Sequence, residues 1–431
     1  MFSGDIMDNK IKQRIAQINN GEVPNGYKKT DFGIFPCDWV TDKTFGDLFD
    51  FYGGLSKSRE ELGKEGHAYL HYGDLHRGAF NVVSYEQYEQ LPKCDIALTG
   101  KETCLMGDGD VAFLDASEDL EGTSRAVLID NPDNKPFIAG LHIIYGKSKD
   151  ASLDKWYKQY ITSSESVKKQ FQRLAAGFKV YGVNRDTLPR IHVAYPASKR
   201  EQSRIAEILM KWDEAFELYD KQIEMLNLYK SICLRKMFPS KGKDVPEWRF
   251  AGFTGAWEQR KLGEVGKARS GVGFPDVEQG GTSGTPFFKV SDMNNDGNEN
   301  EMNVANNYVT DAQITARRWS PVEEVPAIFF AKVGAAVMLN RKRLCRFPFL
   351  LDNNTMAYSL GKDQWDADFA KALFETVDLT SLVQVGALPS YNAGDVEAME
   401  IMLPDVSEQH QIGAYFRQLD NLITLHQRER T

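Results

Sequence analysis

One stretch near the middle of the chain limits the possible folds more than any other, because it predicts a long helix with a heptad repeat. Ser198, followed three residues later by Glu201, forms a capping box, which is typical of a helix N-terminus. Pro239 ends the helix. Residues 201–238 therefore predict a rod about 57 Å long, at ~1.5 Å per residue, which we interpret as a spacer. Its apolar seam recurs in alternating steps of four and three residues, at Ile205, Leu209, Trp212, Phe216, Tyr219, Ile223 and Leu226.

The same pattern returns near the C-terminus. Glu-Gln-His-Gln-Ile from Glu408 matches Glu-Gln-Ser-Arg-Ile from Glu201, 207 residues earlier, and Asp405 with Glu408 forms a second capping box. The repeated seam consists of Ile412, Phe416, Leu419 and Ile423. Further pairs at offsets of 207 to 218 residues are Asp213 with Asp420, Pro196 with Pro404, Asn184 with Asn392, Gly177 with Gly386, Trp156 with Trp365, Asp154 with Asp363, Asp74 with Asp292 and Trp39 with Trp257. We interpret the chain as one unit written twice, each a globular part followed by a helix.

Length and composition suit a soluble protein of two to three domains. Of 431 residues, 42% are apolar and 26% are charged, which is ordinary for globular proteins. The net charge of −9 argues mildly against a nucleic-acid binder, although binding requires only a local basic face. Five cysteines without a CxxC pair predict reduced thiols in the cytoplasm and no zinc site. The sequence shows no signal peptide and no apolar run long enough to span a membrane.

The globular parts predict a mixed α/β (α+β) fold, because short, uneven strands alternate with helices rather than forming a doubly wound sheet. Residues 294–307, rich in Asn, Asp and Glu, predict an exposed loop. Helices are expected at residues 9–19 and 154–174, and strands at residues 69–75, 111–114, 126–129, 137–145, 191–195, 325–331 and 333–339.

The motifs of catalysis are missing. There is no GxxxxGK[ST] phosphate loop, no GxSxG, and no histidine pair with metal-ligand spacing. Gly271-Val272-Gly273 lacks the third glycine of a nucleotide-binding loop, and the Asn-Pro at 131–132 lacks the Pro-aromatic sequence of an adenine methyltransferase. Pro275-Asp276 is followed by no lysine that would complete a nuclease motif. We therefore predict a non-catalytic chain.

The arrangement resembles the specificity subunit of type I restriction-modification systems. Three stretches carry the resemblance: Gly26–Thr30 with Gly33–Trp39, Val245–Val265, and a Pro-then-Glu-Gln-x-x-Ile helix at both 196–205 and 404–412. The resemblance implies two target recognition domains, each reading one half of a split DNA site, separated by two long antiparallel coiled-coil helices. It also implies that catalysis lies elsewhere: methyltransferase subunits bind S-adenosylmethionine and methylate adenine N6, a restriction (motor) subunit uses ATP and Mg, and this chain binds no cofactor or metal.

This resemblance divides the chain into five segments: an N-terminal helix and loop at 1–30, a first recognition domain at 31–197, a central spacer helix at 198–238, a second recognition domain at 239–404 and a C-terminal spacer helix at 405–431. The second helix departs from the first, since it spans 24 residues from Glu408 to Thr431 and nothing matches Glu224–Phe238. A truncated chain or a shortened gene would account for this difference.

DNA-binding candidates are the polar and basic residues of the expected loops, because base edges are read by such side chains and phosphates are contacted by Lys and Arg. In the first domain they are Lys57, Ser58, Arg59, Tyr72, Arg125, Lys179 and Tyr181. In the second domain they are Arg269, Lys289, Arg317, Arg318, Arg341, Lys342 and Arg343. The paired tryptophans Trp39, Trp257, Trp156 and Trp365 are predicted to lie in the core.

A competing interpretation is a protein–protein adaptor with two globular heads on a helical hairpin and no affinity for nucleic acid. The acidic net charge favours it. A fused nuclease-methyltransferase is excluded by the length of the chain and by the missing motifs.

Overall fold

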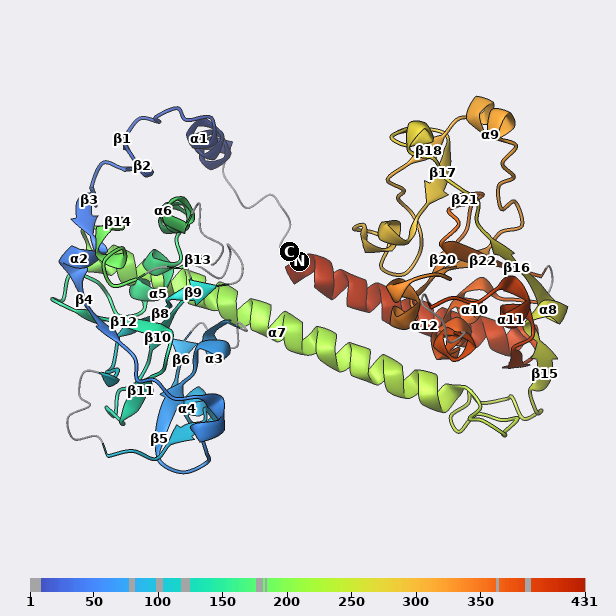
Figure 1. Ribbon diagram of the computed structural model, residues 1–431, viewed down its shortest axis with the longest axis horizontal. Helices are drawn as coiled ribbons and strands as arrows, with labels where there is room; N and C mark the ends of the chain where they lie inside the picture. Colours follow the sequence, from blue (N-terminus) through green and yellow to red (C-terminus); the bar gives the residue numbers. More distant parts are fainter. Residues whose placement is uncertain are drawn as a thin grey trace. The chain divides into compact units, whose positions relative to one another are not determined.

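The computed structural model describes residues 9–76, 82–97, 104–117, 125–175, 181–182, 184–361, 364–383 and 389–430. It forms two compact units, Met1–Glu214 and Ala215–Thr431, and the division falls inside one helix. That helix is α7 (Lys199–Met237), a 39-residue helix that confirms the predicted central rod (Figure 1). Each unit has a core of its own, in which buried phenylalanines are prominent.

The first unit is built around a mixed sheet of short strands, with strand order β4-β12-β8-β10-β6. The strands β4, β12, β8 and β10 are antiparallel to their neighbours, whereas β6 runs parallel to β10. A smaller sheet, β11-β5-β7, and the pair β14-β3 complete the unit. The elements are α1 (Asn9–Asn19), β1 (Tyr27–Thr30), β2 (Gly33–Pro36), β3 (Trp39–Thr44), α2 (Phe45–Leu48), β4 (Phe49–Gly53), η1 (Arg59–Glu61), β5 (His67–Leu70), α3 (Tyr72–His76), β6 (Val82–Val83), α4 (Tyr85–Gln90), β7 (Lys93–Cys94), β8 (Val111–Leu114), β9 (Ala116–Ser117), β10 (Ala126–Ile129), β11 (Phe137–Ala139), β12 (Ile143–Ser148), α5 (Tyr157–Thr162), α6 (Glu165–Ala175), β13 (Tyr181–Gly182), η4 (Leu188–Arg190) and β14 (His192–Pro196).

The second unit repeats this plan. Its main sheet has the order β16-β22-β19-β20, which corresponds to β4-β12-β8-β10, and its parallel pair β17-β21 corresponds to β5-β11. The antiparallel pair β15-β23 corresponds to β3-β14. The elements are β15 (Glu258–Lys261), α8 (Leu262–Val265), β16 (Gly266–Ser270), η5 (Asp276–Glu278), β17 (Thr285–Phe288), η6 (Val290–Asn294), β18 (Tyr308–Val309), α9 (Asp311–Arg317), β19 (Ala327–Ala331), η7 (Ala335–Leu339), β20 (Lys342–Cys345), β21 (Leu350–Leu351), β22 (Thr355–Leu360), α10 (Ala367–Thr376), η8 (Leu379–Leu382), α11 (Ala393–Glu397), β23 (Glu400–Leu403) and α12 (Val406–Arg430).

Several expected elements are interrupted in the structure. Within the strand expected at 333–339, Ala335–Leu339 form the 3₁₀ helix η7 instead, between Gly334 and Asn340, whose φ angles are 87° and 50°. The expected strand at 137–145 is split into β11 and β12, and His142 between them has a φ of 64°. Residues 69–75 leave β5 and enter α3. The helix expected at 154–174 breaks after Thr162, where the hydroxyls of Ser163 and Ser164 donate to carbonyl oxygens of α5.

The alignment of the two halves also needs correction around residue 154, where the pairings of Asp154 with Asp363 and of Trp156 with Trp365 are both displaced by three residues. The side-chain oxygen of Gln202 accepts a hydrogen bond from the backbone of Asp154 at 2.7 Å, and that of Gln409 accepts one from Asp366 at 3.0 Å. Asp154 therefore corresponds to Asp366, so pairing it with Asp363 was wrong by three residues. Asp363, Gly177 and Gly386 lie outside the described residues.

Of the four tryptophans expected in the core, Trp257 is 3% exposed. Trp39, Trp156 and Trp365 are partly buried, and each packs against one of the two cores or against neighbouring rings. Among the described residues, no helix is long and apolar enough to cross a membrane. The described residues also contain no group of three or more His, Cys, Asp or Glu side chains arranged to hold a metal ion.

Candidate nucleic-acid interface and helical spacer

The first-domain candidates Lys57, Ser58 and Arg59 lie together on one turn that leads into η1. The Lys57 ammonium lies 2.8 Å from a carboxylate oxygen of Glu61, and the Ser58 amide donates to the same carboxylate at 2.9 Å. The Arg59 guanidinium lies 2.7 Å from Asp74. The hydrogen bond from Lys57, followed by those from Ser58, lowers the pKa of Glu61 to about 2. The turn is thus an exposed basic segment held in place by acidic neighbours.

The remaining first-domain candidates are more scattered. Tyr72, at the start of α3, is 40% exposed, and its ring lies 5.5 Å from that of His142. Arg125 is partly buried: its Nε has no hydrogen-bond partner among the described residues, and burial lowers the pKa of its guanidinium. Tyr181 belongs to β13, which pairs with β9. Lys179 lies outside the described residues.

In the second domain, two of the candidates contact the turn that contains η5, and two lie elsewhere. The Arg317 guanidinium, at the end of α9, lies 2.7 Å from Glu278, and the Lys289 ammonium donates to Gln279 at 3.0 Å. Arg269 donates to the backbone oxygens of Ser320 and Pro321. Arg318 is exposed and caps α9 in the left-handed conformation, with φ of 54°.

The cluster Arg341, Lys342 and Arg343 does not lie on the surface as a whole. Lys342 is 6% exposed and its ammonium donates to the carbonyl oxygen of Val377, which leaves it no free surface for a phosphate. Burial lowers its pKa to about 8. Arg343 donates to the carbonyl oxygen of Asn298 at 2.6 Å, and burial lowers its pKa as well. Arg341 donates to the side chain of Asn294 at 2.8 Å. The physical reason is that β20 alternates its side chains between the two faces of the sheet, so three consecutive basic residues cannot all face solvent.

The acidic partners of these basic residues were not predicted. Glu61 in η1 and Glu278 in η5 occupy matching places in the repeat, and the pKa of each is lowered by its hydrogen-bond donors. The three-residue spacing of Ser58 and Glu61 is a capping-box signal that the sequence contained.

The predicted antiparallel packing of two helices occurs within the second unit. The hydroxyl of Tyr229 lies 2.7 Å from that of Tyr415, and farther along, the ring of Tyr219 lies 5.8 Å from that of His426. Between these two contacts the residue numbers decrease along α7, from 229 to 219, and increase along α12, from 415 to 426. The two helices therefore run in opposite directions, as Figure 1 shows. The α12 seam residues Ile412, Phe416, Leu419 and Ile423 are buried, at 9% exposure or less. On α7, Ile205, Leu209, Phe216, Tyr219 and Ile223 are partly buried and Trp212 is 55% exposed.

Each spacer helix is fixed to its own domain by the repeated Glu-Gln pair. The Gln202 and Gln409 side chains are buried, and each also donates to the carbonyl oxygen of the proline before its helix, at 2.9 and 3.1 Å. The neighbouring glutamates differ: Glu201 accepts from the Trp39 indole at 3.2 Å, whereas Glu408 forms two hydrogen bonds of 2.7 Å with Arg249. Glutamine at this position therefore acts as the common attachment of domain and helix.

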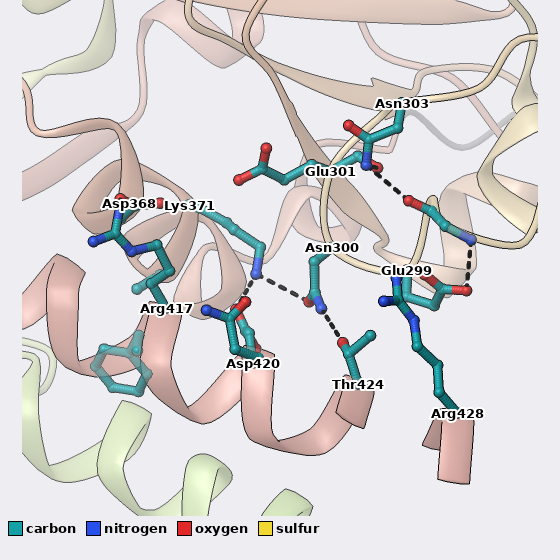
Figure 2. Close-up of a pocket in the computed structure, with 14 residues that line it drawn as sticks. Glu299, Asn300, Glu301, Asn303, Asp368, Lys371, Arg417, Asp420, Thr424 and Arg428 are labelled. Atoms are coloured by element: carbon teal, nitrogen blue, oxygen red, sulfur yellow. Dashed lines mark hydrogen bonds and ion pairs between the residues drawn. The ribbon is translucent and has the colours of Figure 1, made fainter. Parts of the chain in front are cut away.

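Beside α12, the second unit has a polar pocket of about 170 Å³, lined by α10, α12 and the loop of residues 297–303. Figure 2 shows the ammonium of Lys371 directed toward Asp420 and toward Asn300. Asn300 accepts from Lys371 at 3.0 Å and donates to the hydroxyl of Thr424 at 3.1 Å. The Asn-rich loop is therefore joined to both helices by hydrogen bonds, rather than being wholly exposed as the sequence suggested.

Two residues that line this pocket, Lys371 and Asp420, belong to a closed ring of four charged side chains from three helices. Lys230 of α7 lies 2.6 Å from Glu375 and 2.7 Å from Asp420. Lys371 of α10 pairs with the other oxygen of Asp420 and lies 3.6 Å from Glu375. Burial lowers the pKa of Lys230, but the nearby Glu375 and Asp420 carboxylates raise it by more, so the net shift is upward.

Comparisons with known proteins agree with this architecture. Residues 255–431 match the family described as the type I restriction modification DNA specificity domain. The match covers most of the second unit, and the resemblance that the sequence suggested is confirmed.

Along nearly its whole length, the chain is similar to proteins named as specificity subunits. The putative type I restriction enzyme MjaX specificity subunit of Methanocaldococcus jannaschii is 22% identical over 94% of this chain and 92% of its own length. The type I restriction enzyme MjaIX specificity subunit of the same organism is also 22% identical, over 88% of this chain and 86% of its own. Among solved structures, the S subunit of a type I restriction-modification system from M. genitalium has the same fold, with a TM-score of 0.59 at 15% identity, and covers 95% of this chain and 94% of its own.

Proposed function

We propose that this chain is the DNA sequence-recognition subunit of a type I restriction-modification complex. The observation that carries the proposal is the duplicated domain, with matching strand orders and a matching glutamine attachment to a spacer helix. In each copy a basic side chain also pairs with the glutamate of η1 or η5, Lys57 with Glu61 and Arg317 with Glu278. Two equivalent readers joined by a long helix suit a DNA site made of two separated half-sites.

In this proposal each domain reads one half-site of double-stranded DNA and the chain performs no chemistry itself. Exposed Lys and Arg contact phosphates, and polar side chains of the same loops contact base edges. The acidic partners Glu61 and Glu278 hold the basic side chains in a defined position until a phosphate replaces them.

The partners in this proposal are the methyltransferase (modification) subunits and the restriction or motor subunit. S-adenosylmethionine, ATP and Mg belong to those subunits. Exposed apolar residues on α7, such as Leu218, Met225 and Leu228, are 57%, 64% and 62% exposed. Such side chains on a spacer helix are suited to contact with a partner subunit.

The proposal is tested by binding and by mapping. The purified complex of this chain with its methyltransferase subunit is expected to retard duplex DNA and to place N6-methyladenine at one bipartite motif in a genome. The chain alone is expected to transfer no labelled methyl group. Methylation that is unchanged when the gene for this chain is deleted would contradict the proposal. A complex that assembles but binds no DNA would favour the adaptor instead.

A further inference from the structure

Because of the duplication, two similar helices are available to pack against the C-terminal part of α7. Its C-terminal part packs on α12, but α12 repeats the N-terminal part of α7, and Asp420 corresponds to Asp213. A second copy of the chain therefore offers a site like α12 on its own first unit. Apolar seams alone discriminate poorly between two such sites, because hydrophobic contact is not directional.

The α7 seam contains one charged residue where an apolar one is expected. Beyond Leu226 the steps of four and three continue through Lys230, Cys233 and Met237. Cys233 and Met237 are buried, and the Lys230 side chain is 13% exposed. A single lysine in a heptad seam is a known way to specify register and partner at some cost in stability.

Lys230 finds its partners in the second unit. The ring formed with Glu375, Lys371 and Asp420 joins α7, α10 and α12, and its two positive and two negative charges balance. Asp420 and Lys371 are 6% and 8% exposed, whereas the Glu375 side chain is 25% exposed. Most of the ring is therefore shielded from water, which strengthens the interaction of Lys230 with its carboxylates.

The matching place in the first unit lacks this chemistry. Taking Asp154 as the counterpart of Asp366, Gln159 stands where the second unit has Lys371, and Ser163 stands where it has Glu375. Asp213 accepts hydrogen bonds from Tyr160 at 2.7 Å and from Gln159 at 3.4 Å. A lysine brought to this site would meet one carboxylate that already has neutral donors, and Ser163 would offer no acid in the place of Glu375.

We propose that Lys230 is a pairing-specificity residue that directs the C-terminal part of α7 to α12 and α10 of its own chain. It disfavours exchange with the first-unit site of a second copy, which keeps a duplicated chain from forming swapped dimers. The proposal concerns the chain itself and does not depend on its reading DNA.

The test uses the full chain in two differently tagged forms that are refolded or co-expressed together. Lys230→Met keeps a long side chain but removes the charge, and Lys221→Met, at an exposed position of the same helix, is the matched control. The fraction of mixed-tag dimers, measured by tandem affinity capture and light scattering, should rise at least about tenfold for Lys230→Met over the native chain. That is the change expected from a loss of ~1.4 kcal/mol of discrimination. Lys221→Met should behave as the native chain does.

Two further variants keep the proposal testable if Lys230→Met does not fold. In the first, Lys230→Met, Lys371→Met, Glu375→Leu and Asp420→Leu together replace the ring by apolar groups, an exchange that buried ion clusters often tolerate. This variant should keep its helical content and still form mixed-tag dimers. In the second, Gln159→Lys with Ser163→Glu gives the first unit the missing half of the ring, and should raise exchange in a chain whose own ring is intact. Dimer fractions equal to those of the native chain in the folded variants would overturn the proposal.

Discussion

Asp213 in the first unit and Asp420 in the second occupy the same position in a duplicated fold, but the partners of Asp213 are neutral and those of Asp420 are positively charged. Asp213 accepts from the neutral groups of Tyr160 and Gln159, whereas Asp420 lies between Lys230 and Lys371. The scaffold around them is shared, down to the glutamine that joins each helix to its domain. The difference shows that the duplicated framework tolerates independent changes in the contacts between helix and domain.

The largest expected effect tests whether the two units act separately. Replacing residues 31–197 with the matching domain of a relative, with the Gln202 contact kept, should change one half-site completely and leave the other unchanged. The reason is that each unit has its own core and its own attachment to a helix. Genome-wide mapping of methylated adenines measures this. Two altered half-sites would show that the units do not read independently.

The second prediction compares the two glutamates at the start of the spacer helices. Glu408 is fully buried and is the hydrogen-bond partner of Arg249. Glu408→Ala should destabilise the second unit by about 3 kcal/mol, because it leaves the Arg249 guanidinium without that partner. Glu201→Ala removes one hydrogen bond to Trp39 and should cost the first unit about 1 kcal/mol. Denaturant unfolding of each variant, followed by far-UV circular dichroism, measures both costs. Equal losses would mean that the two contacts are equivalent.

A third prediction concerns the buried lysine of the second unit. The pKa of Lys342 is about 8 in the folded chain, below the value of 10.5 for a free lysine, so the unfolded chain binds more protons between these values. This residue should therefore make the chain more stable as the pH rises from about 8 to 10.5. Lys342→Met should remove that rise and should increase stability at neutral pH. Thermal unfolding across this pH range is the measurement, with Lys267→Met, at an exposed position of the same unit, as the comparison. An unaltered profile for Lys342→Met would contradict the assigned burial.

The smallest expected effect concerns a single exposed cation. Arg318→Ala should weaken DNA binding similarly for all sequences and lower the slope of log affinity against log salt by roughly one unit, if Arg318 contacts a phosphate. Arg343→Ala is the internal comparison, because its guanidinium is engaged with the backbone of Asn298. It should leave the salt slope unchanged. A salt titration of both variants decides; if Arg318→Ala also leaves the slope unchanged, Arg318 is surface charge without a phosphate contact.

The repeat and the helices could be predicted because they depend on periodic patterns. The seam residues of α12 and the length of α7 follow from apolar spacing, which is a local property of the sequence. The solvent exposure and the partners of individual charged residues could not be predicted in the same way. Arg341, Lys342 and Arg343 look alike in sequence, but their exposure is set by the pleat of β20 and by the position of Val377, which is distant along the chain.

The ring around Lys230 shows the same limit. Its members come from residues 230, 371, 375 and 420, and only the packing of three helices brings them together. The spacing of Lys230 in the α7 seam was visible in the sequence, but its acidic partners were not. The pairing of Asp154 with Asp363 failed for a related reason, since hydrogen bonds rather than identical letters mark equivalent positions.

The two buried glutamines have a consequence for inheritance. Gln202 and Gln409 make the same contacts to the proline before the spacer helix and to an aspartate just before a domain helix. The coding segments around them encode interchangeable joints. A crossover between the two segments would remove or add one whole unit while leaving an intact joint at the new boundary. The product would be a shorter or longer gene that keeps the glutamine contact at the new boundary, while the differing contacts of Glu201 and Glu408 would have to form anew.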